Sequence, residues 1–193
     1  MKINYPNPSI NHTSQKKTIN RSHGMLFESA LNSSNEFYRN KNLAFIYKKP
    51  TPIQIVKVDY PIRSKARITE AYYKTPSTTD YNGIYKGKYI DYEAKETEHL
   101  TFSFKFISDH QIKHLLKINE HGGIAFIIIY FRRVNRVFII DILKFYDLYI
   151  HQQENNKKSI SIPLLEEKGK EVSLGYTPVI DYLQAVDDLY FTK

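Results

Sequence analysis

Hydrophobic and polar positions along the chain follow two periods. Apolar residues recur every three to four positions in some segments, which predicts amphipathic helices, and they alternate or run uninterrupted in others, which predicts strands. The predicted helices cover residues 23–40, 108–120, 143–154, 164–168 and 180–189. The predicted strands cover residues 43–47, 53–58, 79–85, 88–95, 124–131 and 137–142. This set of elements indicates an α/β protein in which helices flank a central mixed β-sheet.

Two segments fall outside this pattern. Residues 1–20 are polar and rich in Pro, Asn and Ser, and we expect a flexible N-terminal arm there. Residues 59–76 are basic and aromatic, are bounded by Pro61 and Pro76, and hold too few apolar residues for a core element. A segment this long between strands is usually functional or disordered. We interpret it as a stalk that projects from a single domain spanning residues 21–193.

Composition narrows the choice of partner. The net charge of +8 and the pI near 9.4 suit a polyanion, most simply a nucleic acid.

The longest apolar run, at 124–131, is far shorter than the roughly 18 residues of a spanning helix, and the N-terminus lacks the apolar region of a secretory signal. The absence of cysteine excludes a disulfide framework and a thiolate metal site. We therefore expect a cytoplasmic protein without a membrane partner.

Two turn signals compete within the predicted hairpin 79–95. A two-residue loop at the Asn-Gly pair 82–83 would leave Asp80 and Glu93 unrelated to each other. A loop at the Lys-Gly pair 86–87 would place these two carboxylates directly opposite, with their β-carbons roughly 4.5–5.5 Å apart. We prefer the second register, because it leaves strands of adequate length on both sides of the loop.

Opposed carboxylates predict a metal site. Two unpaired carboxylates at this distance repel each other, and a divalent cation between them removes that cost. Mg²⁺ prefers oxygen ligands and typically takes one or two carboxylates plus waters and substrate phosphate, so Asp80 and Glu93 are candidate ligands. Lys95 lies on the same strand face and could orient a water or neutralise charge on phosphorus. Asp91 completes this row of charges as a possible outer carboxylate. The alternative is that the row forms the solvated face of an antiparallel pair.

Two further residues could join this site from the helices. Gln111, in the first turn of the predicted helix 108–120, could hold a water or a phosphate through its side-chain amide. Glu28, on the predicted first helix, could add an outer carboxylate.

The stalk and its flanks form the candidate DNA-binding segment. Between residues 48 and 74 the only acidic residues are Asp59 and Glu70, and the basic ones are Lys48, Lys49, Lys57, Arg63, Lys65, Arg67 and Lys74. Such a segment binds phosphates with salt-sensitive, largely sequence-independent affinity. Tyr72 and Tyr73 could stack on unpaired bases, at roughly 1–3 kcal/mol per base. The alternative is a flexible, solvated loop.

Long strings of this sequence resemble the RecU family of Holliday-junction resolvases, which have a PD-(D/E)xK, restriction-endonuclease-like nuclease core. The strings are KKPTP at 48–52, VDYP at 58–61, PSTTDYNG at 76–83, YIDYEAKET at 89–97, DHQI at 109–112, LGYTP at 174–178 and DYL at 181–183. The resemblance runs from about residue 20 to residue 191, which is essentially the whole predicted domain.

The resemblance implies a homodimer that makes symmetric cuts across a four-way DNA junction with Mg²⁺ or Mn²⁺. The family's catalytic Asp, Glu and Lys fall on Asp80, Glu93 and Lys95. Its active-site Thr falls on Thr78, which joins the metal site. Its junction-contacting arginines fall on Arg63 in the stalk and Arg21 near the N-terminus. A recombinase and a branch-migration helicase are implied as partners by the family alone.

Three functions remain to be distinguished. The leading hypothesis is a structure-selective endonuclease that resolves four-way junctions in recombination and repair. A non-catalytic protein that binds junctions or anneals strands is the first alternative, but it has no need for carboxylates near phosphate. A nuclease that cuts linear duplex is the second, but it has no use for a stalk that fills a junction.

Overall fold

The computed structural model describes residues 25–74 and 78–192. The predicted N-terminal arm and Arg21 lie outside these residues. The α-helices are α1 (Met25–Asn40), α2 (Asp109–Glu120), α3 (Ile142–Glu154), α4 (Ile162–Lys168) and α5 (Tyr182–Tyr190). The strands are β1 (Ala44–Lys48), β2 (Ile53–Asp59), β3 (Arg67–Tyr73), β4 (Tyr81–Tyr85), β5 (Lys88–Thr97), β6 (Thr101–Ser103), β7 (Ile124–Phe131), β8 (Arg136–Asp141), β9 (Ser159–Ser161), β10 (Lys170–Leu174) and β11 (Ile180–Asp181).

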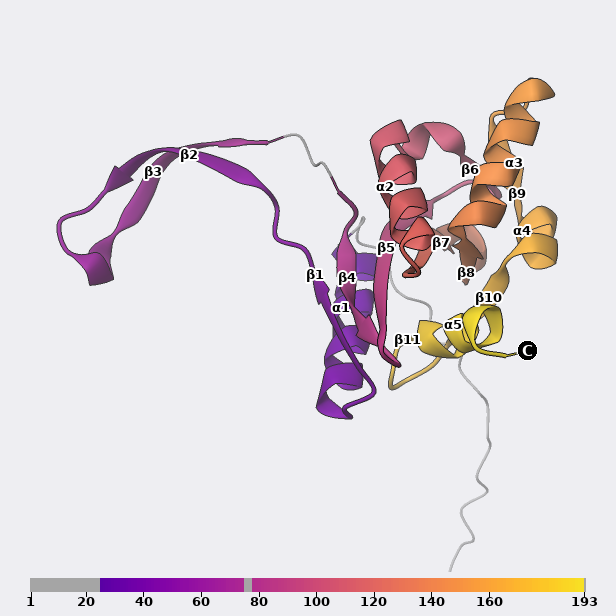
Figure 1. The fold of residues 1–193 in the computed structure, drawn as a ribbon, viewed down its shortest axis with the longest axis horizontal. Helices are drawn as coiled ribbons and strands as arrows, with labels where there is room; N and C mark the ends of the chain where they lie inside the picture. Colours follow the sequence, from indigo (N-terminus) through magenta and orange to yellow (C-terminus); the bar gives the residue numbers. More distant parts are fainter. Residues whose placement is uncertain (1–24, 75–77, 193) are drawn as a thin grey trace, which may run out of the picture.

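A mixed sheet forms the centre of the body, as the sequence predicts (Figure 1). Its strand order is β1-β4-β5-β7-β8-β10-β11. β5 and β7 are parallel along eight residue pairs, from Ile90–Ile124 to Thr97–Phe131, and the other neighbours are antiparallel. Parallel neighbours need a crossover connection, and α2 lies in this one. The order places β5, which carries the candidate site residues, between β4 and β7.

The sheet is covered on both faces. Every residue of β7 is buried, because alternate side chains enter two separate apolar clusters. Phe126 and Ile128 pack with residues of α1 and α5 on one face, whereas Ile127 and Ile129 pack with residues of α2, α3 and α4 on the other. A strand buried on both sides reads as a continuous apolar run, and this explains the pattern at 124–131.

The turn between β4 and β5 lies at Lys86-Gly87, in the register that the sequence analysis prefers. The pairing runs from Tyr85–Lys88 to Tyr81–Tyr92, and both turn residues have positive φ, 47° and 74°. Positive φ at both central residues is the geometry that favours a tight two-residue hairpin.

The competing Asn-Gly pair lies inside β4. A β-carbon on Gly83 would stand 2.0 Å from the carbonyl oxygen of Phe45 on β1. This glycine therefore permits the close approach of two strands and does not form a turn.

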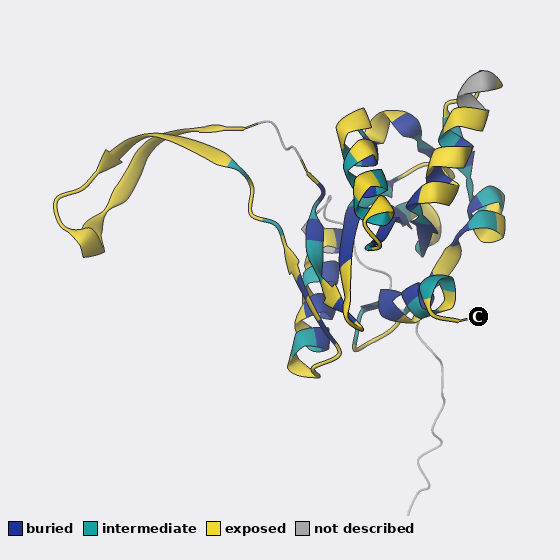
Figure 2. Cartoon of the chain, viewed as in Figure 1, coloured by how far each residue is buried: buried dark blue, intermediate teal, exposed yellow. Residues whose placement is uncertain are grey.

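A second, two-stranded sheet projects from the body (Figure 1). β2 pairs with β3 from Ile53–Tyr73 to Asp59–Arg67, and a 3₁₀ turn at Arg63–Lys65 lies between them at the tip. All residues of both strands are exposed, in contrast to the buried strands of the body (Figure 2). The stalk begins at Ile53, earlier in the chain than the predicted residue 59, because β2 pairs with β3 and with no strand of the seven-stranded sheet. From here on, the stalk means residues 53–73.

Most other boundaries lie within two residues of their predicted positions. α2 begins after Ser108, whose side chain forms a reciprocal capping box with Gln111. The predicted helix 180–189 begins two residues later, because Ile180 and Asp181 form β11. The short strands β6, β9, β10 and β11 lack a repeating apolar pattern and were not predicted, and β3 lies in the segment predicted only as the stalk. Within the described residues, no helix is both long and apolar enough to cross a bilayer.

Candidate active site

Asp80 and Glu93 come together where β4 begins. Asp80 and Glu93 directly follow the last pair of the β4–β5 ladder, Tyr81–Tyr92, and their carboxylates are neighbours. Asp80 lies just before β4, and its carboxylate accepts a hydrogen bond from the backbone N–H of Ala94 at 3.1 Å. The structure thus brings together the two residues that the sequence proposes as metal ligands.

The Glu93 carboxylate is fully buried and only partly satisfied. Its Oε1 atom accepts hydrogen bonds from the Lys95 ammonium and from the Gln111 side-chain amide, the latter at 2.6 Å. Its Oε2 atom is buried and has no hydrogen-bond partner. Burial raises the pKa of Glu93 to about 7, and the neighbouring Asp80 carboxylate adds to this shift, while Lys95 opposes it.

This unpartnered oxygen fits a bound cation. A buried polar atom without a partner is costly, and a divalent cation would satisfy Oε2 while neutralising both carboxylates. Among the described residues, no group of three or more His, Asp or Glu is arranged to hold a metal. The candidate donors are the carboxylates of Asp80 and Glu93, and a Mg²⁺ ion typically takes one or two carboxylates together with water and substrate oxygens.

Gln111 is held in place by its own helix. Its side-chain oxygen accepts hydrogen bonds from the backbone N–H and the hydroxyl of Ser108, and its amide nitrogen donates to Glu93. The side chain thus ties the N-terminus of α2 to the buried carboxylate. In this arrangement Gln111 orients Glu93 through one hydrogen of its amide group, and its contact with a water or a phosphate stays a prediction.

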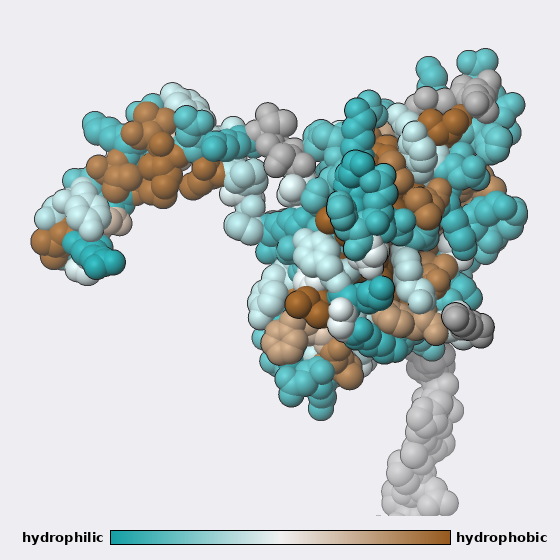
Figure 3. Space-filling model, viewed as in Figure 1, coloured by the Kyte–Doolittle hydropathy of each residue, from teal (hydrophilic) through white to brown (hydrophobic). Residues whose placement is uncertain are grey.

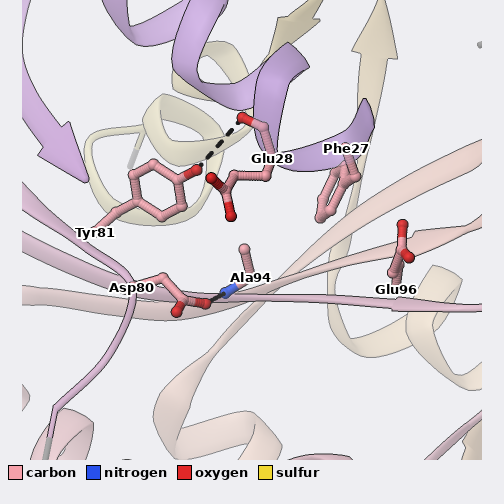
Figure 4. A pocket seen from close by; sticks show the side chains of 6 residues that line it. All are labelled: Phe27, Glu28, Asp80, Tyr81, Ala94 and Glu96. Atoms are coloured by element: carbon pink, nitrogen blue, oxygen red, sulfur yellow. Dashed lines mark hydrogen bonds between the residues drawn. The ribbon is translucent and has the colours of Figure 1, made fainter. Parts of the chain in front are cut away.

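A shallow pocket lies beside Asp80, between α1 and β5 (Figure 4). Glu28, Asp80 and Glu96 line it, together with Phe27, Tyr81 and Ala94. The Glu28 carboxylate forms an ion pair with Lys48 at 2.6 Å. Glu28, predicted as an outer carboxylate, and Lys48, predicted to bind DNA, therefore pair with each other beside this pocket.

Asp91 has a different environment from Glu93. Its carboxylate is completely buried and accepts hydrogen bonds from Lys49, Thr79 and Tyr89, and His114 Nε2 lies 3.2 Å away. Both of its oxygens are thus occupied by protein donors. The sequence pattern placed Lys49 only among the basic residues of the DNA-binding segment and did not single out Thr79. The KKPTP and STTD strings were the signals that could have pointed to this contact.

The two adjacent threonines differ in exposure. Thr78, which the family resemblance proposes for the metal site, is exposed. Thr79 is buried, and its hydroxyl accepts a hydrogen bond from Lys49 and donates one to Asp91.

The predicted DNA-binding side chains occupy both ends of the stalk. Arg63 and Lys65 form its tip and Arg67 begins β3, and all three are exposed. Tyr72 and Tyr73, with Lys74 after them, lie at the opposite end, next to the body. The tyrosine nearest the tip is Tyr60, which sequence reasoning did not single out and which is 61% exposed.

The mixed sheet, the opposed carboxylates and the adjacent lysine define a class of protein: an α/β protein with a carboxylate–lysine centre suited to phosphodiester chemistry. The family model described as "RecU: Recombination protein U" matches residues 22–188. The chain therefore belongs to the RecU family.

Individual relatives agree with this assignment. The chain is 48% identical over 171 residues to the Holliday junction resolvase RecU of Geobacillus kaustophilus, a match that covers 88% of this chain and 86% of that protein. It is 46% identical over 200 aligned residues to the Holliday junction resolvase RecU of Bacillus cereus strain G9842, with 100% of both chains covered. A solved structure of Archaeoglobus fulgidus Hjc, a Holliday junction resolvase, is 13% identical with a TM-score of 0.46 over 75% of this chain and 93% of that chain. A likeness at this TM-score adds nothing to the assignment.

The raised pKa of Glu93 predicts a pH-dependent stability. Well below pH 4.5, the ordinary pKa of a glutamate, the Glu93 carboxyl is protonated in both the folded and the unfolded protein and does not lower the stability. As the pH rises from 4.5 to about 7, the unfolded state ionises first and the folded state loses relative stability. The full loss is about 3 kcal/mol. Glu93→Gln removes this titration, so the variant should gain stability relative to the wild type as the pH rises.

Urea unfolding in the presence of a chelator, between roughly pH 5 and pH 8, measures this difference. The exposed Glu36→Gln is the matched control and should follow the wild type. Parallel wild-type and Glu93→Gln profiles would contradict the prediction.

Proposed function

We propose that this chain is a structure-selective endonuclease that resolves four-way (Holliday) DNA junctions by paired, symmetric phosphodiester hydrolysis in recombination and repair. The observation that carries the proposal is the buried Glu93 oxygen without a partner, opposite Asp80 and next to Lys95. Membership of the RecU family and relatives named Holliday junction resolvases support the substrate. The stalk supports the preference for a branched substrate.

The proposed cofactor is Mg²⁺, for which Mn²⁺ can substitute. Asp80 and Glu93 would hold the cation, and Thr78 is a further proposed contact. When bound, it would polarise the scissile phosphate and lower the pKa of a coordinated water. Lys95 is 24% exposed and already contacts Glu93, so its ammonium can reach from the buried carboxylate toward a phosphate and neutralise developing charge.

The stalk supplies the proposed contact with the junction. Arg63, Lys65 and Arg67 bring three cations to its tip, where each phosphate neutralised releases counterions from the DNA. Tyr60 near the tip, and Tyr72 and Tyr73 near the body, offer aromatic faces for unpaired bases. Arg21 is proposed as an additional DNA contact from the family resemblance.

A homodimer is the proposed working form. A four-way junction has near two-fold symmetry, and two incisions need two sites. Apolar side chains gather on the stalk (Figure 3), where the cross-strand pairs Ile53–Tyr73 and Val58–Ile68 are all more than 40% exposed. An exposed apolar surface of this kind favours contact with the stalk of a second copy. A recombinase and a branch-migration helicase are further proposed partners, from the family resemblance alone.

Asp80→Asn should abolish cutting while the protein stays folded and bound to the junction. Losing one of two metal ligands should lower the cutting rate at least about a hundredfold. The measurement compares a labelled immobile four-way junction with a linear duplex of the same sequence, with Mg²⁺ and then Mn²⁺. The exposed Asp147→Asn makes the same charge change and should cut like the wild type. Tight junction binding without cutting by any of these proteins, with either metal, would support the non-catalytic alternative.

Replacing residues 53–74 by a short Gly-Ser linker should remove the preference for the junction over the duplex. The stalk carries most of the basic side chains proposed to enter the junction, while both carboxylates lie in the body. Thermal unfolding of the body serves as the control for folding. Competition binding and cutting on both substrates measure the preference, and an unchanged preference would refute the role of the stalk.

Ile55→Glu should shift the protein from dimer to monomer, because it places a charge among the exposed apolar side chains of the stalk. Gln54→Glu adds the same charge at the neighbouring residue of β2 and should associate like the wild type. Sedimentation velocity across a range of concentrations measures the shift. Equal association of the two variants would show that the dimer forms elsewhere.

A further inference from the structure

Three side chains meet at the base of the stalk without an assigned role in the reaction. Lys49 donates to the Thr79 hydroxyl and to the Asp91 carboxylate, both at 2.8 Å, and the same hydroxyl donates to the other oxygen of Asp91. The three residues thus form a closed ring of hydrogen bonds. We call this ring the stalk clamp.

The stalk has two legs, the chain segments that flank it and that hold Lys49 and Thr79. The stalk clamp joins both legs to the strand that carries Glu93. Lys49 is the first residue after β1, where the chain leaves the body for the stalk, and Thr79 is where it has returned. Asp91 lies on β5 two residues before Glu93, so its side chain is on the same face of the strand.

The clamp also contacts the second carboxylate-bearing segment. The backbone N–H of Lys49 donates to the carbonyl oxygen of Asp80 at 2.7 Å, and Thr79 directly precedes Asp80. The Lys49 side chain is only 17% exposed and is engaged twice, so it is poorly placed to bind a DNA phosphate. Its charge acts inside the protein, on Asp91.

The stalk depends on its base for orientation. Every residue of β2 and β3 is exposed, so the strands have no buried face against the body along their length. The Asp91 carboxylate has no exposed surface, and a charge-assisted hydrogen bond to such a group is stronger than one in water. A displacement of either leg would therefore strain the ring next to both catalytic carboxylates.

We propose that Lys49, Thr79 and Asp91 are positioning residues that fix the stalk relative to the Asp80–Glu93 pair and thereby select which phosphodiester of the junction is cut. The inference rests on the proposed junction-cutting function. The stalk would locate the centre of the junction, and the clamp would set the distance from that centre to the cut. A structural role alone would change stability or rate but would leave the position of the cut unchanged.

The test maps incisions at nucleotide resolution on a labelled immobile four-way junction with Mg²⁺. Lys49→Gln removes the cation and Thr79→Val removes the hydroxyl without changing charge, so the second variant still tests the clamp if the first fails to fold. Lys49→Arg keeps the cation. Tyr89→Phe removes a different hydrogen bond to Asp91, one that does not come from either leg of the stalk.

In Lys49→Gln and Thr79→Val, we expect cuts to spread to neighbouring phosphodiesters and the rate at the wild-type position to fall about 10- to 100-fold. Junction binding and the thermal shift induced by Mg²⁺ should stay at wild-type values, and Lys49→Arg and Tyr89→Phe should keep the wild-type cut position. The proposal would be overturned if Lys49→Gln and Thr79→Val both cut only at the wild-type position, whatever their cutting rates. A wild type that cuts no junction with either metal would instead refute the proposed function on which it rests.

Discussion

Burying the Glu93 carboxylate in the middle of a sheet carries a desolvation cost that its neighbours only partly offset. Lys95 and Gln111 share one oxygen, the other has no partner, and Asp80 adds a second negative charge opposite. This cost supports the proposed cation site, because a bound divalent cation would offset it. The surrounding sheet makes the arrangement possible, because the register of β4 on β5 and the packing of β5 on β7 leave these two carboxylates little freedom to move apart.

The row of acidic side chains on β5 divides into two roles that are two residues apart. Asp91 has protein donors on both oxygens, whereas Glu93 keeps one oxygen open. The first carboxylate is therefore engaged by groups at the base of the stalk, and the second fits the proposed role in catalysis. The prediction that Asp91 is an outer carboxylate of a metal site stands beside its contacts with Lys49 and Thr79 at the base of the stalk.

Local patterns predicted much of the fold and the centre of the site. Strand length favoured a hairpin loop at Lys86-Gly87 over the Asn-Gly pair, and the resulting register predicted Asp80 opposite Glu93. The continuous apolar run at 124–131 predicted the central strand, and Ser108, a typical N-cap residue, stands at the predicted start of α2. Each of these signals is short-range, because strand pairing across a tight turn and helix capping involve residues close in the sequence.

The sequence by itself thus determined most of the helices and the longer strands of the body, the two neighbouring carboxylates, the basic stalk and, through its resemblance to the RecU family, the class of enzyme. Only the tertiary structure decided that β2 belongs to the stalk, that Gln111 orients Glu93, that Lys48 is paired with Glu28, and that Lys49 is turned inward to Asp91. The physical reason is the same in each case. A lysine or a glutamine has the same local pattern whether it faces solvent or a buried carboxylate, and its partner is fixed by contacts between residues far apart in the chain.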